Sequence, residues 1–203
     1  MQLCRLKKFP IKPRRWQHLR YLNLSSNRWI EELPQEISLL YNLLTMDVSH
    51  CRSLCRLPNN MKYMRSLRHL YTNGCTSLEC MPPDLGQVTS LQTLTYFVVG
   101  SSSSCSTVGE LQHLNLSGEL DLNGLENATE EHVKAASLGI KEKLTHLSLK
   151  WNSEDDEELI SDCHSKVLDA LKPPGGMEML RIVNYKGSNI PTWLKILVCF
   201  SSN

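Results

Sequence analysis

The feature that most constrains the fold is a repeat with a period of 24 residues. LRYLNLSSN begins at Leu19, LLTMDVSHC at Leu43, LRHLYTNGC at Leu67 and LQTLTYFVV at Leu91, each 24 residues after the one before. A unit this short cannot bury its own apolar side, so neighbouring units must stack and share one core. The repeat therefore predicts an elongated solenoid with one coil per unit rather than a closed globule.

The shared pattern of these units is L-x-x-L-x-L-x-x-N/C, the signature of leucine-rich repeats. The register continues after the expected strand, where an apolar residue is followed by proline at Leu33-Pro34, Leu57-Pro58 and Met81-Pro82. Proline fixes φ and is poorly suited to a regular strand interior. We therefore predict an α/β fold, a leucine-rich-repeat solenoid (horseshoe) with a parallel concave sheet and an irregular or helical convex side.

The later units are longer than the first ones. We expect a lead-in and partial repeat at residues 1–18, then a solenoid of about seven repeats at 19–203, with starts near 19, 43, 67, 91, 117, 144 and 177. The extra length includes a Ser-rich insertion at 101–106 and an acidic loop at 153–158. Segments 129–138 and 159–171 have helical patterns, and the second places Ile160, Cys163, Val167, Leu168 and Leu171 on one apolar face.

The eight cysteines are predicted to be packing residues or exposed thiols. Cys51 and Cys75 fall at the Asn/Cys position of the repeat, where a small thiol can be buried. Cys55 and Cys80 fall at positions where sister units carry Glu or Arg, so they are expected to face water. Their spacing differs between units and gives no complete set of zinc ligands. Without a visible export signal, the cysteines are expected to be reduced.

No motif of catalysis or phosphate binding is present in the sequence. We therefore predict no catalytic, cofactor-binding or metal-binding residues, and a protein that is not an enzyme. The net charge of +1 gives no overall attraction to nucleic acid or to a membrane. No apolar run approaches the roughly 18 residues that cross a bilayer.

The outward side chains of the expected strands form the predicted protein-binding surface. They differ from repeat to repeat, and several are aromatic or carry hydrogen-bonding groups, as at protein interfaces. Phe97 and Val183 are also expected to point outward. The partner-binding residues predicted on this concave face are Tyr21, Asn23, Asp47, Ser49, His69, Tyr71, Asn73, Thr95, Glu119, Asp121, His146, Lys150 and Arg181.

Several longer segments resemble the leucine-rich-repeat region of plant coiled-coil-type nucleotide-binding leucine-rich-repeat (NLR) disease-resistance proteins. These are LRYLNLSSN, SLQTLTYFVVG, LSGELDLNGLENA, LTHLSLKW and VLDALKPPGGMEMLRIVNYKGSNIPTW, within residues 17–194. The resemblance implies a cytoplasmic domain of plant defense and innate immunity that binds a pathogen effector or a host protein. It also implies packing on the nucleotide-binding module of the parent receptor, of which this chain is expected to be a fragment.

Two other functions remain open at this stage. One alternative is an extracellular leucine-rich-repeat receptor ectodomain. Asn-x-Ser/Thr motifs, which are N-glycosylation acceptors in exported proteins, begin at Asn23, Asn115 and Asn127. The missing export signal and the Leu-Pro motif argue against that alternative. A protein-interaction scaffold without an immune role is the third possibility.

Overall fold

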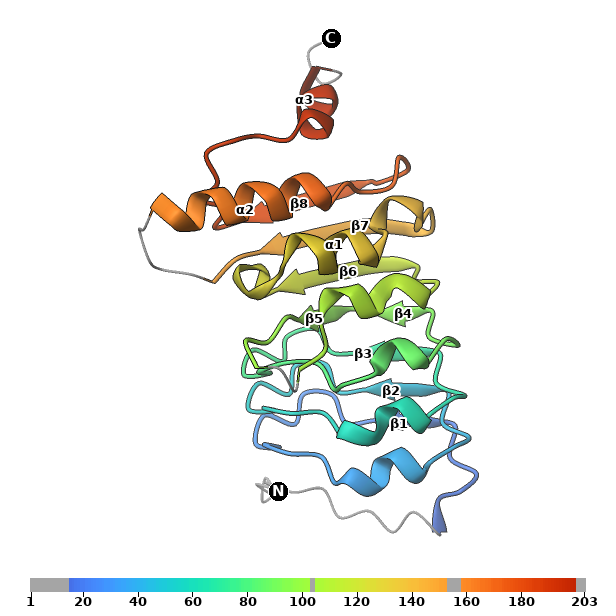
Figure 1. Cartoon of the computed structure of the whole chain (residues 1–203). Coiled ribbons are helices and arrows are strands. Elements are labelled where there is room, and N and C mark those ends of the chain that lie inside the picture. The colour runs from blue at the N-terminus through green and yellow to red at the C-terminus, as the bar shows by residue number, and fades with distance from the viewer. Residues whose placement is uncertain (1–14, 103–104, 153–157, 200–203) are drawn as a thin grey trace.

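The computed structural model describes residues 15–102, 105–152 and 158–199. The chain winds into coils stacked one above another, with helical segments on one side and strands on the other (Figure 1). The strands form two parallel four-stranded sheets, in the orders β1-β2-β3-β4 and β5-β6-β7-β8. This arrangement confirms the predicted α/β leucine-rich-repeat solenoid.

The strands are short in the first sheet and longer in the second. The first sheet holds β1 (Tyr21–Asn23), β2 (Thr45–Asp47), β3 (His69–Tyr71) and β4 (Thr93–Leu94). The second holds β5 (Tyr96–Val98), β6 (Gly118–Asn123), β7 (Leu144–Lys150) and β8 (Met179–Val183).

Helical segments follow the strands on the opposite side of the coils, which we call the helix side (Figure 1). The 3₁₀ helices are η2 (Gln35–Leu39), η3 (Asn59–Tyr63), η4 (Leu85–Gln87), η5 (Val108–His113), η6 (Leu125–Asn127) and η7 (Leu138–Ile140). The α-helices are α1 (Glu130–Ala136), α2 (Glu158–Ala170) and α3 (Thr192–Cys199). The two helical patterns of the sequence correspond to α1 and α2.

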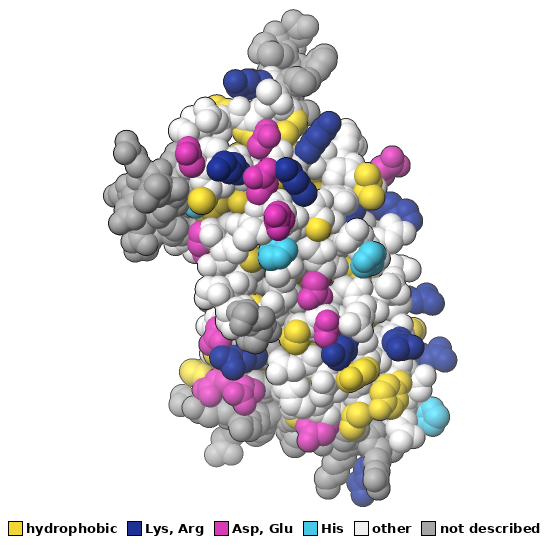
Figure 2. Space-filling model, viewed as in Figure 1, with side chains coloured by type: hydrophobic (Ala, Val, Ile, Leu, Met, Phe, Trp, Pro, Cys, Tyr) yellow, Lys and Arg dark blue, Asp and Glu magenta, His cyan; other side chains and the backbone are white. Residues whose placement is uncertain are grey.

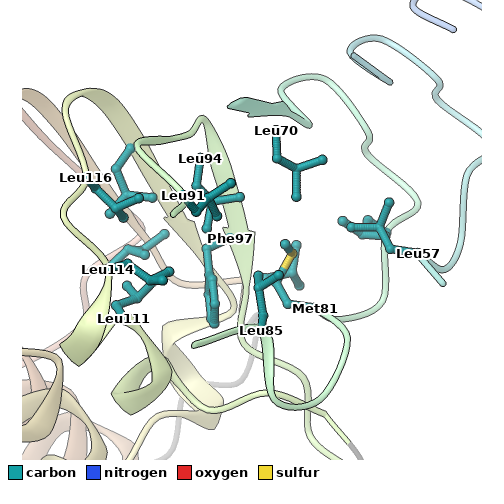
Figure 3. Packing of buried hydrophobic residues seen from close by; sticks show 14 of the residues in the cluster. Leu57, Leu70, Met81, Leu85, Leu91, Leu94, Phe97, Leu111, Leu114 and Leu116 are labelled. Carbon is teal, nitrogen blue, oxygen red and sulfur yellow. The ribbon is translucent and has the colours of Figure 1, made fainter. Parts of the chain in front are cut away.

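The core lies between the sheets and the helical segments and runs through the stack (Figure 3). Leu22 pairs in register with Met46, Met46 with Leu70, and Leu70 with Leu94. All four are buried. Burying a side chain of this size contributes roughly 1.5–3 kcal/mol, so a ladder of such residues stabilises every coil through its neighbours.

The cysteines at the repeat's Asn/Cys position are buried as predicted. The thiol of Cys51 donates to the carbonyl oxygen of Leu24 at 3.0 Å, and that of Cys75 to the carbonyl oxygen of Val48 at 3.1 Å. Burial raises the pKa of Cys75 to about 12. These two thiols therefore remain protonated and serve as capping and packing groups in the turns.

Two of the other cysteines contradict the prediction that all the thiols are free. Cys80 and Cys105 form a disulfide, with their Cα atoms 5.7 Å apart. Cys105 belongs to the Ser-rich insertion, which has no counterpart in the other units. For that reason the repeat register could not have placed it beside Cys80.

The boundary between the two sheets lies at Thr95, and we call it the seam. β4 ends at Leu94 and pairs with β3, whereas β5 begins at Tyr96 and pairs with β6. The alternation of inward and outward side chains shifts by one residue across the seam. Phe97 therefore pairs with Leu122 and is fully buried. The prediction that Phe97 points outward is therefore wrong.

The predicted apolar face of α2 differs from the structure at one position. Val167, Leu168 and Leu171 are buried as expected, but Cys163 is exposed and His164 takes its place with 2% exposure. The side chain of Ile160, residues 153–157 of the predicted acidic loop and the basic segment 1–14 lie outside what the structure describes, and Glu158 is the first residue of α2.

Candidate protein-interaction face

The outward side chains of the two sheets form a continuous surface on the side opposite the helices, which we call the strand face. On the first sheet, Tyr21, Thr45, His69 and Thr93 follow one another as register partners. Parallel pairing in register keeps equivalent side chains adjacent, about 4.8 Å apart. Each unit therefore contributes one position to a shared row.

The second row of the first sheet contains Asn23, Asp47 and Tyr71. The rings of Tyr71 and His69 are stacked with centroids 6.4 Å apart and an interplanar angle of 15°. The ring nitrogen Nδ1 of His69 lies 3.0 Å from the hydroxyl oxygen of Thr93. These contacts hold two aromatic rings in fixed positions on a half-exposed surface, which is typical of residues that contribute strongly to binding.

Three of the predicted binding residues also serve the turns that follow the strands. Asn23 accepts a hydrogen bond from the backbone nitrogen of Ser25 at 2.8 Å. Asp47 Oδ1 accepts from the backbone nitrogen of Ser49 at 2.9 Å and from its hydroxyl at 2.6 Å. Ser49 is only 9% exposed, so its hydroxyl stabilises this turn and offers little surface to a partner.

Asn73 and Thr95 lie at the seam, and their side chains join the two sheets. The hydroxyl oxygen of Thr95 accepts from the backbone nitrogens of Thr72 at 2.9 Å and of Asn73 at 3.1 Å. The same hydroxyl donates to Asn73 Oδ1 at 3.3 Å. These hydrogen bonds replace ladder bonds where the strand pairing changes, so both residues have a structural role at this position.

The second sheet carries an ion pair across its outward surface. Lys150 Nζ lies 2.8 Å from Asp121 Oδ2, and both side chains are partly exposed. Ser148, between Asp121 and Arg181 in the register, is 7% exposed. Glu119, His146 and Met179 form the neighbouring row. The surface therefore combines charges of both signs with an exposed apolar side chain.

Tyr96 is a strand-face residue that the sequence did not indicate. It is half-buried and pairs with Asp121. Burial and, to a lesser extent, the charge of Asp121 raise the pKa of its hydroxyl, whereas a side-chain hydrogen bond with Asn123 lowers it. The net effect is a raised pKa, so the hydroxyl stays protonated. The signal was hidden because the 24-residue register assigns the outward position to Thr95.

The helix side has a different character (Figure 2). Acidic and basic side chains lie interspersed over its upper part. On α1, Lys134 Nζ lies 2.6 Å from Glu130 Oε1. Exposed pairs of this kind contribute little to stability, because water and salt screen the two charges. Tyr63, at the end of η3, is 53% exposed, and Lys62 Nζ lies over its ring, 5.6 Å from the ring centroid.

Within the described ranges, no three His, Cys, Asp or Glu side chains converge in a way that could hold a metal ion. In the same ranges, no helix has both the length and the apolar character required to cross a membrane. The ordered rows of outward side chains on the two sheets are the candidate functional surface.

Residues 108–202 match the family model described as R13L1/DRL21 leucine-rich repeats. The putative disease resistance protein RGA4 of Solanum bulbocastanum is 37% identical over 74% of this chain and 15% of its own length. Disease resistance protein RGA2 of the same species is 39% identical over 75% of the chain and 16% of its own length. Disease resistance RPP13-like protein 4 of Arabidopsis thaliana is 29% identical over 88% of the chain and 20% of its own length.

The chain therefore spans about a sixth of the length of the first two of these relatives. Among solved structures, a leucine-rich-repeat protein of Leptospira interrogans aligns over 87% of this chain and 43% of its own, with a TM-score of 0.44 and 16% identity.

Proposed function

The chain is a leucine-rich-repeat solenoid of the type found in plant disease-resistance proteins, and from this premise we propose that it is the protein-recognition and autoregulatory domain of a cytoplasmic plant immune receptor. The observation that carries the proposal is the strand face, whose rows of unlike side chains are held in fixed register by the parallel sheets. The partner is a pathogen effector or a host protein that an effector alters.

The physical basis of recognition is a rigid surface with polar and aromatic groups already in place. Tyr21 and Arg181 are exposed, and Tyr71, His69 and Asp121 are partly exposed. Because their backbone is fixed by the ladders, little conformational entropy is lost when a partner binds. Aromatic and arginine side chains contribute most to binding at such surfaces.

The autoregulatory part of the proposal follows from competition between two partners. The domain packs on the nucleotide-binding module of the parent receptor in the resting state. A recognised protein that binds the released arrangement more tightly shifts the balance toward it, by no more than its difference in affinity for the two states.

A photo-crosslinking experiment tests the strand face against the helix side. A photoreactive phenylalanine analogue replaces Tyr71 in one variant of the 203-residue chain and Tyr63 in the control variant, and both are expressed in plant leaf cells. We expect Tyr71 to yield a cross-linked protein that Tyr63 does not. A nucleotide-binding protein among the products supports autoregulation, and another host or pathogen protein supports recognition.

Two further variants show whether the cross-link depends on the proposed surface. His69→Ala and Asp121→Asn, each added to the Tyr71 variant, are expected to reduce the cross-linked yield about tenfold without changing the circular dichroism. Leu70→Asp serves as the unfolded reference, because Leu70 is fully buried. The same products from Tyr71 and Tyr63, or none from Tyr71, would contradict the proposal.

A further inference from the structure

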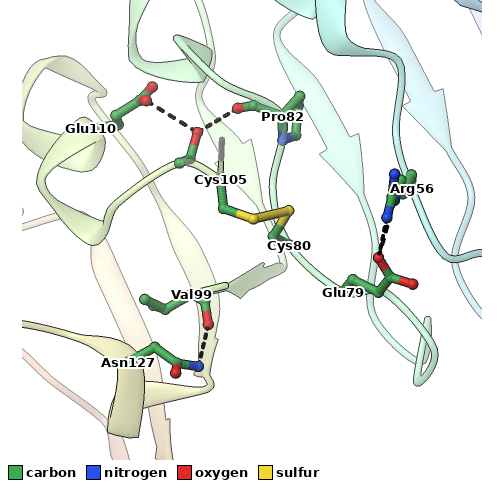
Figure 4. Close-up of a disulfide and its surroundings, with 9 residues drawn as sticks. Arg56, Glu79, Cys80, Pro82, Val99, Cys105, Glu110 and Asn127 are labelled. Carbon is green, nitrogen blue, oxygen red and sulfur yellow. Dashed lines mark hydrogen bonds and ion pairs between the residues drawn. A yellow bond between two sulfur atoms is a disulfide. The ribbon is translucent and has the colours of Figure 1, made fainter. Parts of the chain in front are cut away.

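The Cys80–Cys105 disulfide, drawn in Figure 4, lies at the wall of a pocket. The pocket has a volume of about 400 Å³, and both cysteines line it together with Arg56, Glu79 and Ser101. Both cysteines are partly exposed. The sulfur atoms are therefore accessible to a reagent that enters the pocket from solvent.

The backbone beneath the disulfide is shaped to receive it. A Cβ atom at Gly100 would lie 2.5 Å from Cys80 Cβ and 2.5 Å from Cys105 Sγ. Heavy side-chain atoms do not approach this closely, so a residue with a side chain could not occupy this position beside the two cysteines. Gly100 thus leaves the space in which the two cysteines meet.

The segment that follows Cys105 is also held by contacts that do not depend on the disulfide. The backbone nitrogen of Ser106 donates to the carbonyl oxygen of Met81 at 3.2 Å, and that of Met81 to Val98 at 3.3 Å. The carboxylate of Glu110 accepts from the backbone nitrogen of Gly86 at 2.8 Å. Cleavage of the disulfide therefore leaves this coil with its own hydrogen bonds.

The disulfide closes a ring with a sequence separation of 25 residues, and this ring contains the seam at Thr95. At the seam, hydroxyl hydrogen bonds take the place of the regular ladder. A covalent tie across such a region restricts its local opening, because it removes conformations from the opened state.

Cys51 and Cys75 differ from the disulfide pair in both position and chemistry. They are buried, and burial is the largest cause of the raised pKa of each thiol. Thiol–disulfide exchange requires access and a thiolate, and these two cysteines provide neither. Among these four cysteines, Cys80 and Cys105 are therefore the pair available for reversible thiol–disulfide exchange.

We propose that Cys80–Cys105 is a redox-responsive modification site whose reduction by a dithiol loosens the seam between the two sheets. One thiolate of the dithiol attacks either sulfur, the Cys80–Cys105 bond breaks, and a mixed disulfide forms. The second thiolate of the dithiol resolves it. Two electrons and two protons pass to the two cysteines, and the dithiol becomes a disulfide.

The test is a titration of the full chain with mixtures of reduced and oxidised dithiothreitol. Thiols that appear are labelled, counted by mass spectrometry and mapped to peptides, while circular dichroism monitors the fold. We expect the labels of Cys80 and Cys105 to appear together in one reversible step with the circular dichroism unchanged. In the reduced protein, hydrogen exchange at the amides of Met81 and Ser106 should accelerate about tenfold, while the amides of Leu147 and Leu149 keep their rates.

Two sets of variants provide the controls. Cys80→Ser combined with Cys105→Ser should reproduce the fast exchange and no longer respond to dithiothreitol, whereas Cys55→Ser combined with Cys163→Ser should respond as the parent does. If the double variant at 80 and 105 does not fold, reduced and alkylated parent protein replaces it.

Three results would overturn the proposal. The first is free Cys80 and Cys105 thiols in protein purified without reductant. The second is reduction that occurs only together with unfolding, as for the structural disulfide of an exported protein. The third is reduction that leaves the exchange of Met81 and Ser106 unchanged.

Discussion

Thr72 is a buried polar residue at a position where the repeat otherwise places an apolar side chain. It is fully buried, and its hydroxyl donates to the carbonyl oxygen of Tyr96 at 2.9 Å. That carbonyl lies just past the seam, where β5 has begun to pair with the second sheet. The hydroxyl therefore satisfies a backbone group at the change of pairing, and this accounts for the departure from the apolar pattern.

Thr72→Val tests this role at nearly constant volume. The substitution leaves the Tyr96 carbonyl without this donor, and we expect it to lower the free energy of unfolding by about 1–2 kcal/mol. The measurement is urea denaturation followed by circular dichroism. Thr45→Val, at a partly exposed strand position, is the control and should change stability by less than about 0.5 kcal/mol. Equal effects of the two variants would contradict the role assigned to Thr72.

A second residue-scale feature is a column of left-handed backbone conformations that follows the strands. Ser26, His50 and Gly74 occupy equivalent positions of successive units and have φ values of 62°, 60° and 75°. The sequence gives little sign of this column, because glycine occurs at one of the three positions. The shared turn is visible only in the positive φ values of these residues. This left-handed conformation costs a residue other than glycine roughly 1 kcal/mol.

Gly74→Ala is expected to destabilise the protein by about 1–2 kcal/mol, because alanine is strained at positive φ. In addition, its Cβ would lie 2.4 Å from His50 Nδ1, which would have to move. Gly175→Ala is the matched control, since nothing lies within 4 Å of a Cβ at that position. Thermal unfolding of both variants measures the difference, and a neutral Gly74→Ala would show that the turn adjusts without cost.

At the scale of elements, the contact of α2 with the second sheet depends on a buried histidine. The His164 ring lies 5.6 Å from the Trp151 ring and 6.5 Å from the Tyr185 ring, between centroids. Its two ring nitrogens are buried and make no hydrogen bond within the described residues. Burial lowers the pKa of His164, and the charge of Lys186 lowers it further, while Glu126 acts in the opposite direction.

These contacts predict that the protein loses stability in mild acid. The unfolded chain binds a proton at His164 near the ordinary pKa of 6.5, and the folded protein does so only at lower pH. The free energy of unfolding therefore falls as the pH drops below about 6.5 and levels off below the folded pKa. Urea titrations of the parent and of His164→Phe between pH 5 and 8 measure this effect. The variant should lose part of the slope, whereas His132→Phe, at an exposed position, should keep it.

The elements also show how far the sequence predicts this fold. The 24-residue period predicts that equivalent residues of successive units lie side by side, and Leu22, Met46 and Leu70 are indeed register partners. Phe97 was assigned to the wrong face because the seam changes the pairing partner within one unit, and a shift of one residue reverses a strand's faces. Cys163 was predicted to be buried, but His164 is buried in its place. Neighbouring residues of a helix differ by about 100° in direction, and neither cysteine nor histidine clearly marks a core position.

The placement of the strand-face side chains was predicted in outline and less well in detail. The lateral row that contains Tyr71 follows from the 24-residue period, and the row that contains Asp121 follows from the predicted starts of the later, longer units. The period does not predict that Ser49 forms a hydrogen bond in a turn or that Thr95 forms hydrogen bonds at the seam. These roles depend on where the backbone lacks a hydrogen-bond partner. The Cys80–Cys105 bond could not be predicted, since the position of an insertion is not set by the repeat.

At the scale of the whole molecule, each coil contacts mainly its neighbours, so stability varies along the stack. The second sheet has the longer strands, and β6 and β7 pair over six register positions, compared with three for β1 and β2. The first sheet is therefore expected to open more readily than the second.

Met46→Ala tests this gradient. The residue is fully buried in β2, and its truncation should cost about 2–5 kcal/mol. Hydrogen exchange should accelerate in β1, β2 and β3, with little change in β6 and β7. Leu147→Ala, in β7, is the matched substitution in the second sheet and should also affect the coils on both sides of it. Equal acceleration along the whole chain after Met46→Ala would instead indicate one cooperative unit.

The in-register pairing of β1, β2 and β3 has a consequence for how such a chain can change over generations. Residues 43–66 make up one complete period, and Leu67 begins the next unit at the same phase as Leu43. Unequal recombination that deletes or duplicates this segment would therefore rejoin compatible neighbours and leave the seam and the disulfide ring untouched. Each row of the strand face would become shorter or longer by one position, so the length of this part of the solenoid is open to selection independently of the rest.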